Sequence, residues 1–408
     1  MRAPDLQLPG MPNIHSHAFQ RAMAGLAERH KNPTDSFWTW REQMYRFAGR
    51  ITPEAQYDIA AQLYAEMLEA GYTCVCEFHY LHHQPGGQPY ADPAAMSRAL
   101  MQAARDTGIR LTLLPVLYMT GGFDGRPLSE RQRRFGHEVE DYLDLVSLLQ
   151  REEDERLKIG IAFHSLRAVP ELAMREVLDE IGKDRTPIHI HISEQLAEVD
   201  ECKALRGCRP IEWLLTNISV DERWTLVHAT HITPAEANGI AERKAIVALC
   251  PTTEANLGDG LFPLREFFDL DGRIGIGSDS NVSVSAVEEL RWLEYGQRLI
   301  THERAVGITI AEPSVGRCLF EQTVAGGLQS CGQPSQAEDR ILLDTDAPAL
   351  FGATRDDLHD RFVFGGNRSL IREVHVGGRI AVSEGRHPRR DQIAAAYRKT
   401  LTRLLSEV

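Results

Sequence analysis

Two histidines near the start of the chain, His15 and His17, have the spacing of a metal-binding pair. They lie at the end of an apolar segment, Met11–His17, whose composition predicts a β-strand. Side chains at positions i and i+2 of a strand point to the same side, so both imidazoles could bind one ion. Taken alone, such a pair is more often two hydrogen-bonded histidines without a metal. Its meaning depends on what the rest of the chain places beside it.

Residues with similar chemistry follow the ends of other apolar segments. The eight segments predicted to be strands are Met11–His17, Thr73–His79, Leu111–Leu117, Lys158–His164, Ile188–Ile192, Thr225–His228, Ala245–Cys250 and Ile274–Ser278. Seven of them finish in histidine, carboxylate or hydroxyl side chains. These are His15, His17, Glu77, His79, Tyr80, Tyr118, His164, His189, His191, Glu194, His228, Ser278, Asp279 and Ser280. Such regular placement predicts one shared site.

The elements between these strands show helical periodicity. Several begin with proline in the first turn, which is a helix-start signal. They include Pro53–Ala70, Pro93–Thr107, Gly136–Glu152, Pro170–Gly182, Pro210–Asn217 and Pro234–Arg243. Eight such strand–helix units predict an α/β fold of the (β/α)8 TIM-barrel type, whose chemistry lies at the carboxyl ends of the strands. A doubly wound open sheet is the alternative, but no G-x-G-x-x-G motif follows the first strand.

The alternation of strands and helices gives way to short strands and turns after about residue 335. Short strands are predicted at 341–344, 361–364, 371–376 and 379–382, with turns at Gly365-Gly366-Asn367 and Gly377-Gly378. A last helix is predicted over Asp391–Leu405. We therefore expect a barrel over residues 10–335, a small β-sandwich-like appendage from 1–9 and 336–386, and a C-terminal helix in 387–408.

Composition excludes several classes of protein. With 43% hydrophobic and 25% charged residues, the chain has the balance of a soluble globular protein. Its net charge of −13 argues against nucleic acid or an anionic membrane as partner. No apolar run is long enough to cross a membrane, and the N-terminus lacks the features of a signal peptide. The seven scattered cysteines suit free thiols in a reducing cytoplasm.

Several longer stretches resemble a known family. The His-x-His strand end, the later histidines and Gly277-Ser278-Asp279-Ser280 resemble the amidohydrolase superfamily. Within it, the chain is similar to the formimidoylglutamate deiminases of bacterial histidine degradation. The blocks that carry this resemblance are His15–Gly25, Ser36–Arg41, Glu77–Tyr80, Phe163–Val169, Val227–His231, Thr253–Gly260 and Glu289–Arg298.

The resemblance implies a metal-dependent hydrolytic deamination. N-formimino-L-glutamate would be converted to N-formyl-L-glutamate and ammonia by a cytoplasmic enzyme, expected to be a homodimer by analogy with related barrels. One alternative is another deaminase of the superfamily, acting on a heteroaromatic amine. A second is a protein that binds metal without catalysis.

The resemblance also implies one divalent metal, expected to be zinc, on His15, His17, His191 and Asp279. Strand spacing does not distinguish His189 from His191, but the family pattern His-x-x-Glu selects His191, because Glu194 follows it by three residues. His189 is then expected to pack inside the barrel. Iron or manganese would also suit these ligand types.

Roles for the other site residues follow from the same resemblance. Asp279 would accept the proton of the attacking water, Glu194 would protonate the imino nitrogen, and His228 would hold the attacking oxygen or polarise the amidine. Arg41 and Arg167 would bind the two carboxylates of the substrate. The remaining pocket positions that match the family and could hydrogen-bond the substrate are Gln20, Tyr80 and His164.

Some residues nearby receive other interpretations. Trp38 and Trp40 are expected to pack in a lid, and His79, His82 and His83 are expected to be supporting or loop histidines. Asp259 is interpreted as a turn residue. The chain also departs from the family, whose members carry several tens of residues before the first barrel strand. Here only Met1–Gly10 precede it, so either the start is truncated or misassigned, or the appendage consists of C-terminal strands alone.

Overall fold

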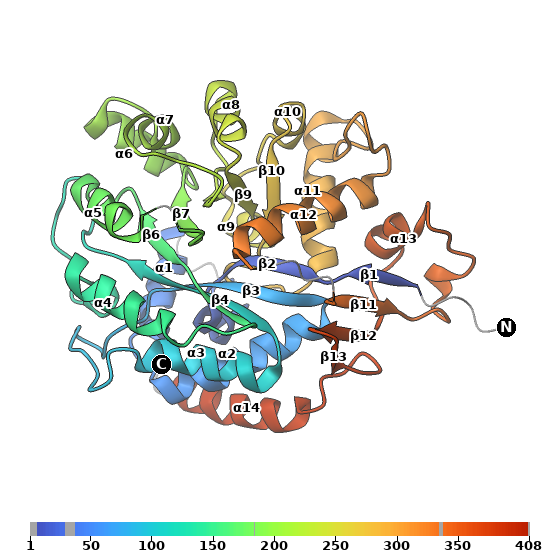
Figure 1. Cartoon of the computed structure of the whole chain (residues 1–408), viewed down its shortest axis with the longest axis horizontal. Coiled ribbons are helices and arrows are strands. Elements are labelled where there is room, and N and C mark those ends of the chain that lie inside the picture. The colour runs from blue at the N-terminus through green and yellow to red at the C-terminus, as the bar shows by residue number, and fades with distance from the viewer. Residues whose placement is uncertain (1–5, 29–36, 183, 334–337, 407–408) are drawn as a thin grey trace.

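A parallel β-barrel surrounded by helices forms most of the molecule (Figure 1). The computed structural model describes residues 6–28, 37–182, 184–333 and 338–406. The barrel strands are β2 (Met11–Ser16), β3 (Tyr72–His79), β4 (Arg110–Leu117), β5 (Leu157–Ile159), β6 (Ile161–Ser165), β7 (Ile188–Ile192), β8 (Trp224–His228), β9 (Ile246–Leu249) and β10 (Arg273–Ile276). Because only Gly160 separates β5 from β6, these elements occupy the eight predicted strand positions. The TIM-barrel prediction is confirmed.

The barrel closes between its first and last strands. Ser16 and Asp279 form a parallel bridge just beyond β10. The amide of Asp279 donates to the carbonyl of His15 at 2.9 Å, and the amide of His17 donates to the carbonyl of Asp279 at 2.9 Å. Gly277 permits this approach, because a Cβ there would lie 2.7 Å from the Cβ of His15. The closing seam therefore runs through residues that the sequence assigns to the active site.

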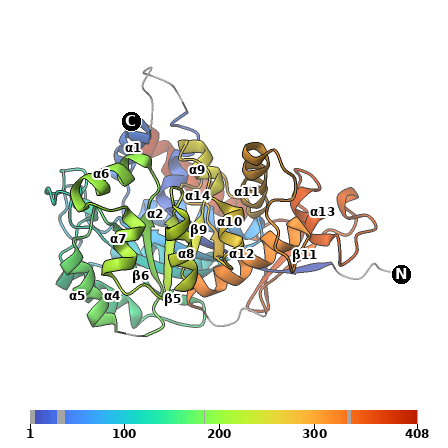
Figure 2. The same cartoon turned by 90° about the horizontal axis from the view of Figure 1, so that it is seen from above.

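Helices cover the outside of the barrel in the order that the alternating pattern predicts. Figure 2 shows α1 (Phe37–Ala48) and α9 (Pro251–Leu257) toward the same side of the molecule. The helices of the barrel region are α1 (Phe37–Ala48), α2 (Pro53–Glu69), α3 (Ala95–Thr107), α4 (Val139–Gln150), α5 (Glu171–Ile181), α6 (Leu196–Arg206), α7 (Pro210–Asn217), α8 (Pro234–Glu242), α9 (Pro251–Leu257), α10 (Leu264–Phe268), α11 (Ala286–Thr301) and α12 (Val315–Cys331). Among the described residues, no helix is both long and apolar enough to span a lipid bilayer.

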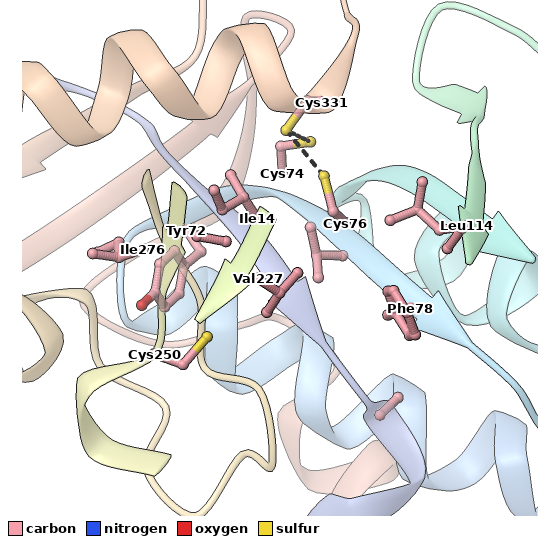
Figure 3. Packing of buried hydrophobic residues seen from close by; sticks show 14 of the residues in the cluster. Ile14, Tyr72, Cys74, Cys76, Phe78, Leu114, Val227, Cys250, Ile276 and Cys331 are labelled. Atoms are coloured by element: carbon pink, nitrogen blue, oxygen red, sulfur yellow. Dashed lines mark hydrogen bonds between the residues drawn. The ribbon is translucent and has the colours of Figure 1, made fainter. Parts of the chain in front are cut away.

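The last turn of α12 packs against buried strand residues. The Sγ atom of Cys331 lies 3.5 Å from the Sγ atoms of both Cys74 and Cys76, as Figure 3 shows. The carbonyl oxygen of the neighbouring Ser330 accepts a hydrogen bond from Nε2 of His189 at 3.2 Å. All of these side chains are buried. They form part of the packed interior, and His189 has the structural place that the sequence predicted.

A four-stranded sheet adjoins the barrel. It has the order β1 (Gln7–Pro9), β11 (Arg340–Leu343), β12 (Ile371–Val376) and β13 (Arg379–Val382), with antiparallel pairing throughout. The N-terminal segment therefore contributes an edge strand, and the described appendage does not consist of C-terminal strands alone. The division into domains stays a prediction, since its limit at residues 335 and 336 lies outside the described residues.

The strand predicted at 361–364 is wrong. This segment belongs to helix α13 (Leu358–Phe364). Its aromatic and β-branched residues favoured a strand locally, but Leu358 and Phe362 are buried at helical i, i+4 spacing. Asp357 also accepts from Arg361 one turn later, at 2.7 Å. Packing on α12, where the rings of Phe320 and Phe362 are 6.1 Å apart, outweighs the local strand preference.

The C-terminal helix α14 (Arg390–Ser406) returns to the barrel and packs along α2 (Figure 1). The hydroxyl of Thr400 donates to the carboxylate of Asp58 at 2.6 Å. The hydroxyl of Tyr397 donates to the carbonyl of Arg21 at 3.4 Å. The helix thus connects the end of the chain to the segment that follows the His-x-His strand.

Candidate active site

Three imidazoles and one carboxylate converge where the barrel strands end. The Nε2 atom of His15 lies 3.2 Å from Nε2 of His17 and 3.0 Å from Nε2 of His191. Oδ1 of Asp279 lies 3.4 Å from His15 Nε2 and 3.2 Å from His17 Nε2. These four residues are buried. The four predicted metal ligands therefore lie together, although they come from three separate strands.

The orientation of two of the rings is set by their other nitrogen. Nδ1 of His17 lies 3.0 Å from the carbonyl oxygen of Phe78, and Nδ1 of His191 lies 3.0 Å from that of His164. A carbonyl can only accept, so each Nδ1 carries a proton and Nε2 is the nitrogen that faces the cluster. Such outer contacts are typical of histidines that bind metal.

The protonation states of the cluster also suit a cation. Burial lowers the pKa of His15 to about 3 and lowers that of His191 as well, so both imidazoles stay neutral. Burial alone would raise the pKa of Asp279, but contacts with His15 and His17 hold it well below its usual range. Three imidazole nitrogens and one carboxylate are a donor set that fits a divalent ion such as zinc.

A polar network holds Asp279 in place. Asp279 and Asn281 adopt left-handed backbone conformations, with φ of 45° and 57°. The Asn281 amide donates to the carbonyls of His17 at 3.1 Å and Asp279 at 3.0 Å. The side-chain oxygen of Asn13 accepts a hydrogen bond from the backbone amide of Ser278 at 3.1 Å. These bonds offset the backbone strain and fix the carboxylate relative to β2.

His228 lies beside the cluster and faces several carboxylates. Its Nδ1 is 3.3 Å from Oε1 of Glu254, and its Nε2 is 4.0 Å from Oδ2 of Asp279. Burial alone would lower the pKa of His228, but Glu194, Glu254 and Asp279 together raise it to about 10. An imidazolium at this position can donate a hydrogen bond toward the pocket.

Glu194 stands just after β7 and lines the same pocket. Burial raises the pKa of its carboxyl group, and the nearby Asp279 adds to the effect. A carboxyl group with a raised pKa holds its proton longer and can act as an acid near neutral pH.

One pocket contains almost the whole predicted site. Its empty volume is about 630 Å³ including its open mouth, which is in the range for small-molecule sites. Every predicted site residue except His15 lines it, namely Gln20, Arg41, Tyr80, His164 and Arg167 together with His17, His191, Glu194, His228 and Asp279. His15 contacts the cluster from beneath. Trp40 also lines the pocket, whereas the side chain of Trp38 lies outside the described residues.

The Arg167 side chain is partly buried and lines the pocket. Its Nε atom is buried and has no hydrogen-bond partner among the described residues. Among the described residues, no carboxylate lies within 4.0 Å of it. Arg41 enters the same pocket from α1, where its Nε donates to the Tyr45 hydroxyl at 2.9 Å. Removing a guanidinium from water without a counter-charge is costly, and a bound anionic ligand would supply that charge.

Gln20 and Tyr80 form a hydrogen-bonded pair in the pocket wall. The amide nitrogen of Gln20 donates to the Tyr80 hydroxyl at 2.8 Å, and Oε1 of Gln20 is buried without a partner. That oxygen can accept from an N–H group of a ligand. His164 lies nearby, with its ring 4.3 Å from that of Tyr118.

Some residues of the site were not found from sequence. Tyr45 and Phe135 line the pocket, and Glu254 contacts His228. Tyr118, which the sequence placed at the end of a predicted strand, also lines the pocket. Tyr45 follows Arg41 by one helical turn and so carried a weak signal. Glu254 carried none, because its contact with His228 arises only when α9 folds over β8.

Asp259 is more than the predicted turn residue. Its side chain is buried, accepts from the Gln195 amide and leaves Oδ2 without a partner. Burial, together with the charge of Glu194, raises its pKa to about 9. It stands next to the active site and does not line the pocket.

The other histidines form a separate group. The rings of His82 and His137 are 4.4 Å apart, and those of His83 and His137 are 4.7 Å apart. Nε2 of His83 donates to the Gly136 carbonyl at 2.7 Å. This group joins the loop after β3 to the loop that carries Phe135, so it supports the pocket wall from behind.

Comparison with known proteins agrees with this geometry. The amidohydrolase family model matches residues 6–312. A formimidoylglutamate deiminase from Pseudomonas aeruginosa is 52% identical over 98% of this chain and 89% of its own length. A 5-methylthioadenosine/S-adenosylhomocysteine deaminase from Natronomonas pharaonis is 27% identical over 93% of this chain and 82% of its own.

Solved structures show the same architecture. The crystal structure of an amidohydrolase from Brucella melitensis superposes with a TM-score of 0.94 at 44% identity, over 98% of this chain and 90% of that one. A zinc-bound adenosine deaminase from Xanthomonas campestris shares the fold, with a TM-score of 0.80 at 19% identity, over 98% of this chain and 86% of that one. Barrel, donor cluster and sequence together lead to one conclusion, which is that the chain belongs to the amidohydrolase family.

Proposed function

We propose that the chain is a metal-dependent deiminase that hydrolyses N-formimino-L-glutamate to N-formyl-L-glutamate and ammonia in histidine degradation. The observation that carries the proposal is the pairing of a donor cluster that could hold a metal with the Arg167 guanidinium, whose Nε atom is buried, in one pocket. The 52% identity to the deiminase from Pseudomonas aeruginosa supports the same substrate.

The charge of the pocket favours a substrate with two carboxylates. The chain as a whole carries a net charge of −13, which opposes an anion at long range. Arg41 and Arg167 reverse this locally, and each guanidinium can bind a carboxylate with two parallel hydrogen bonds. We therefore assign the two carboxylates of the substrate to these residues.

His15, His17, His191 and Asp279 would hold one divalent ion, with zinc as the proposed metal. When bound, such an ion lowers the pKa of water and supplies a hydroxide nucleophile at neutral pH. Two observations support this assignment. The donor atoms of His17 and His191 lie close to that of His15, and the outer nitrogens of His17 and His191 are held by backbone carbonyls.

The chain's own residues would move the protons. Hydroxide would form a C–O bond with the formimino carbon, with Asp279 taking the proton that leaves the water and Glu194 donating a proton to the terminal nitrogen, which becomes an amine. Asp279 would then pass its proton to the same nitrogen, while the hydroxyl oxygen on the carbon returns its proton to Glu194. The bond from carbon to nitrogen would break, so that the formyl C=O forms, ammonia leaves and both carboxyl groups recover their starting states. His228 donates a hydrogen bond to the oxygen on which charge develops, as its raised pKa allows. Gln20 can accept from an N–H group of the substrate through Oε1.

The experiment that tests the proposal compares substrates. Ammonia release is measured with N-formimino-L-glutamate, guanine, cytosine and adenosine under identical conditions, with the zinc-loaded protein. We expect release from the formimino compound alone. Release only from a ring amine would replace the proposal with the heteroaromatic deaminase alternative, and release from none would favour metal binding without catalysis.

A homodimer in the cytoplasm completes the proposal. The described residues include seven cysteines, all with free thiols, as in proteins of reducing compartments. Trp292, Tyr295 and Leu299 are exposed along one side of α11 and could be covered by a second copy. Light scattering coupled to size-exclusion chromatography measures the mass, and a monomer would remove this part of the proposal.

A further inference from the structure

Glu198 is a buried carboxylate beside the active site that none of the roles above uses. It lies in the first turn of α6, and its side chain reaches back to the loop that carries Glu194. Its Oε2 accepts from the backbone amide of Glu194 at 3.0 Å. We propose that Glu198 is a positioning residue, which holds the backbone of Glu194 so that the Glu194 carboxyl faces the substrate. The inference rests on the proposed function, because it concerns the acid of that reaction.

The loop needs such a restraint. Ser193, directly before Glu194, has a left-handed backbone with φ of 53°, which is costly for a residue other than glycine. On the other side, the side-chain amide of Gln195 donates to the carboxyl group of Asp259. Glu198 thus holds the backbone amide of Glu194, whereas Asp259 holds only the side chain of the next residue. Loss of the first bond would let the strained turn relax and carry Glu194 away.

A purely structural explanation must be separated from this one. A glutamate at the third helical position often accepts backbone amides and stabilises the helix start. Glu236 does the same in α8, where its Oε2 accepts from the amide of Thr233 at 2.8 Å, and it is also buried. Glu236 does not line the pocket. It is therefore a matched control for the stability of a helix start without an effect on the site.

Glu198 could affect the site through its negative charge or through the hydrogen bond that its side-chain length permits. Among the charged groups near Arg167, Glu198 contributes most to raising its pKa, although the described residues form no ion pair between the two side chains. A change acting through Arg167 would alter substrate binding and hence KM. A change acting through the Glu194 backbone would alter the chemical step and hence kcat. Two variants distinguish these effects, because Glu198→Asp keeps the charge and shortens the side chain, whereas Glu198→Gln keeps the length and removes the charge.

The test measures kcat and KM for N-formimino-L-glutamate, bound zinc and thermal midpoint for wild type, Glu198→Asp, Glu198→Gln and Glu236→Asp. We expect Glu198→Asp to lower kcat by about 10- to 100-fold, the loss typical of a misplaced catalytic group, with bound zinc unchanged. Glu198→Gln should keep most of kcat, because its amide oxygen can accept the same bond. Glu236→Asp should lower the thermal midpoint similarly to Glu198→Asp and leave kcat unchanged.

Each other outcome counts against the inference. Normal kcat in Glu198→Asp, or equal loss of kcat in Glu198→Asp and Glu198→Gln, would overturn it while the proposed function stands. A rise in KM with kcat unchanged would overturn it in favour of an effect on Arg167. An inactive wild type would overturn the proposed function and this inference with it.

Discussion

Asp279 and His15 are joined twice, once through the backbone and once through their side chains. The Asp279 amide donates to the His15 carbonyl at 2.9 Å, and Asp279 Oδ1 lies 3.4 Å from His15 Nε2. The first contact closes the barrel and the second belongs to the donor cluster. The residues that close the fold and the residues proposed to bind metal are therefore the same, and their contributions can be separated by substitution.

Replacing the Asp279 carboxylate should remove the metal and preserve the barrel. In Asp279→Asn the backbone bonds of the seam remain possible, whereas the only anionic donor of the cluster is lost. We expect bound zinc to fall to a minor fraction after dialysis, activity to disappear, and the far-ultraviolet circular dichroism spectrum to stay that of wild type. Zinc is measured by atomic emission. Full zinc content in the variant would remove Asp279 from the ligand set.

Removing the Arg167 guanidinium should weaken substrate binding. We expect Arg167→Met to lower kcat/KM by about 10- to 100-fold, since a charge-assisted hydrogen bond contributes roughly 1.5–3 kcal/mol. Arg206→Met is the matched control, because Arg206 is partly buried over the Trp213 ring, at 4.1 Å, and does not line the pocket. A kcat/KM for Arg167→Met close to that of Arg206→Met would exclude Arg167 from the substrate site.

The histidine group behind the pocket should make stability depend on pH. Burial lowers the pKa of His79 and His137 to about 3, whereas an unfolded histidine has a pKa of about 6.5. The unfolded chain therefore binds more protons below pH 6.5. The free energy of unfolding should be highest above that pH and should fall toward pH 3, by about 1.4 kcal/mol per pH unit for each histidine.

His137→Phe tests this dependence. Both ring nitrogens of His137 lack hydrogen-bond partners, so an apolar ring of similar shape should fit. Urea unfolding of wild type and variant at about pH 7.5 and about pH 5 should show a pH effect smaller by about 2 kcal/mol in the variant. An identical pH effect in both proteins would show that His137 is not buried in its neutral form.

The close approach at Gly277 should not tolerate a side chain. In Gly277→Ala the added Cβ would lie 2.7 Å from the His15 Cβ and 2.8 Å from the His15 carbonyl oxygen. We expect the free energy of unfolding to fall by about 1–3 kcal/mol and zinc affinity to fall with it, because β10 must move away from β2. A chelator competition assay measures the affinity. Unchanged affinity would mean that His15 and Asp279 can separate without cost to the donor cluster.

Much of the barrel could be predicted from sequence because its signals are local. Apolar segments separated by helical patterns identified the eight strand positions, and the polar residues at their ends indicated the site. The segment at 361–364 shows where such signals fail. Its aromatic residues favour a strand when considered alone, and only the surface of α12 makes Phe362 part of a helix.

The site residues also fall into those that local spacing indicates and those that only the folded structure brings together. His15 and His17 are visible in sequence because strand geometry places them together, and the family resemblance supplied the partners on other strands. The contact of Glu254 with His228 and the tether between Glu198 and Glu194 depend on how α9 and α6 return to the barrel. Spacing along the chain carries no information about either contact. Asp259 resembles a turn residue for the same reason, since its burial arises from neighbours distant in sequence.

Only Gly10 stands between β1, the edge strand of the appendage, and β2, which carries His15. Its amide donates to the carbonyl of Asp339 at 3.0 Å, and a Cβ there would lie 2.4 Å from the Thr73 side chain. The appendage and the donor cluster are thus connected by one short, continuous segment of backbone. Local opening of the small sheet would displace the ligands on β2. Conversely, metal bound to the cluster would slow amide hydrogen exchange in the small sheet, although that sheet does not line the pocket.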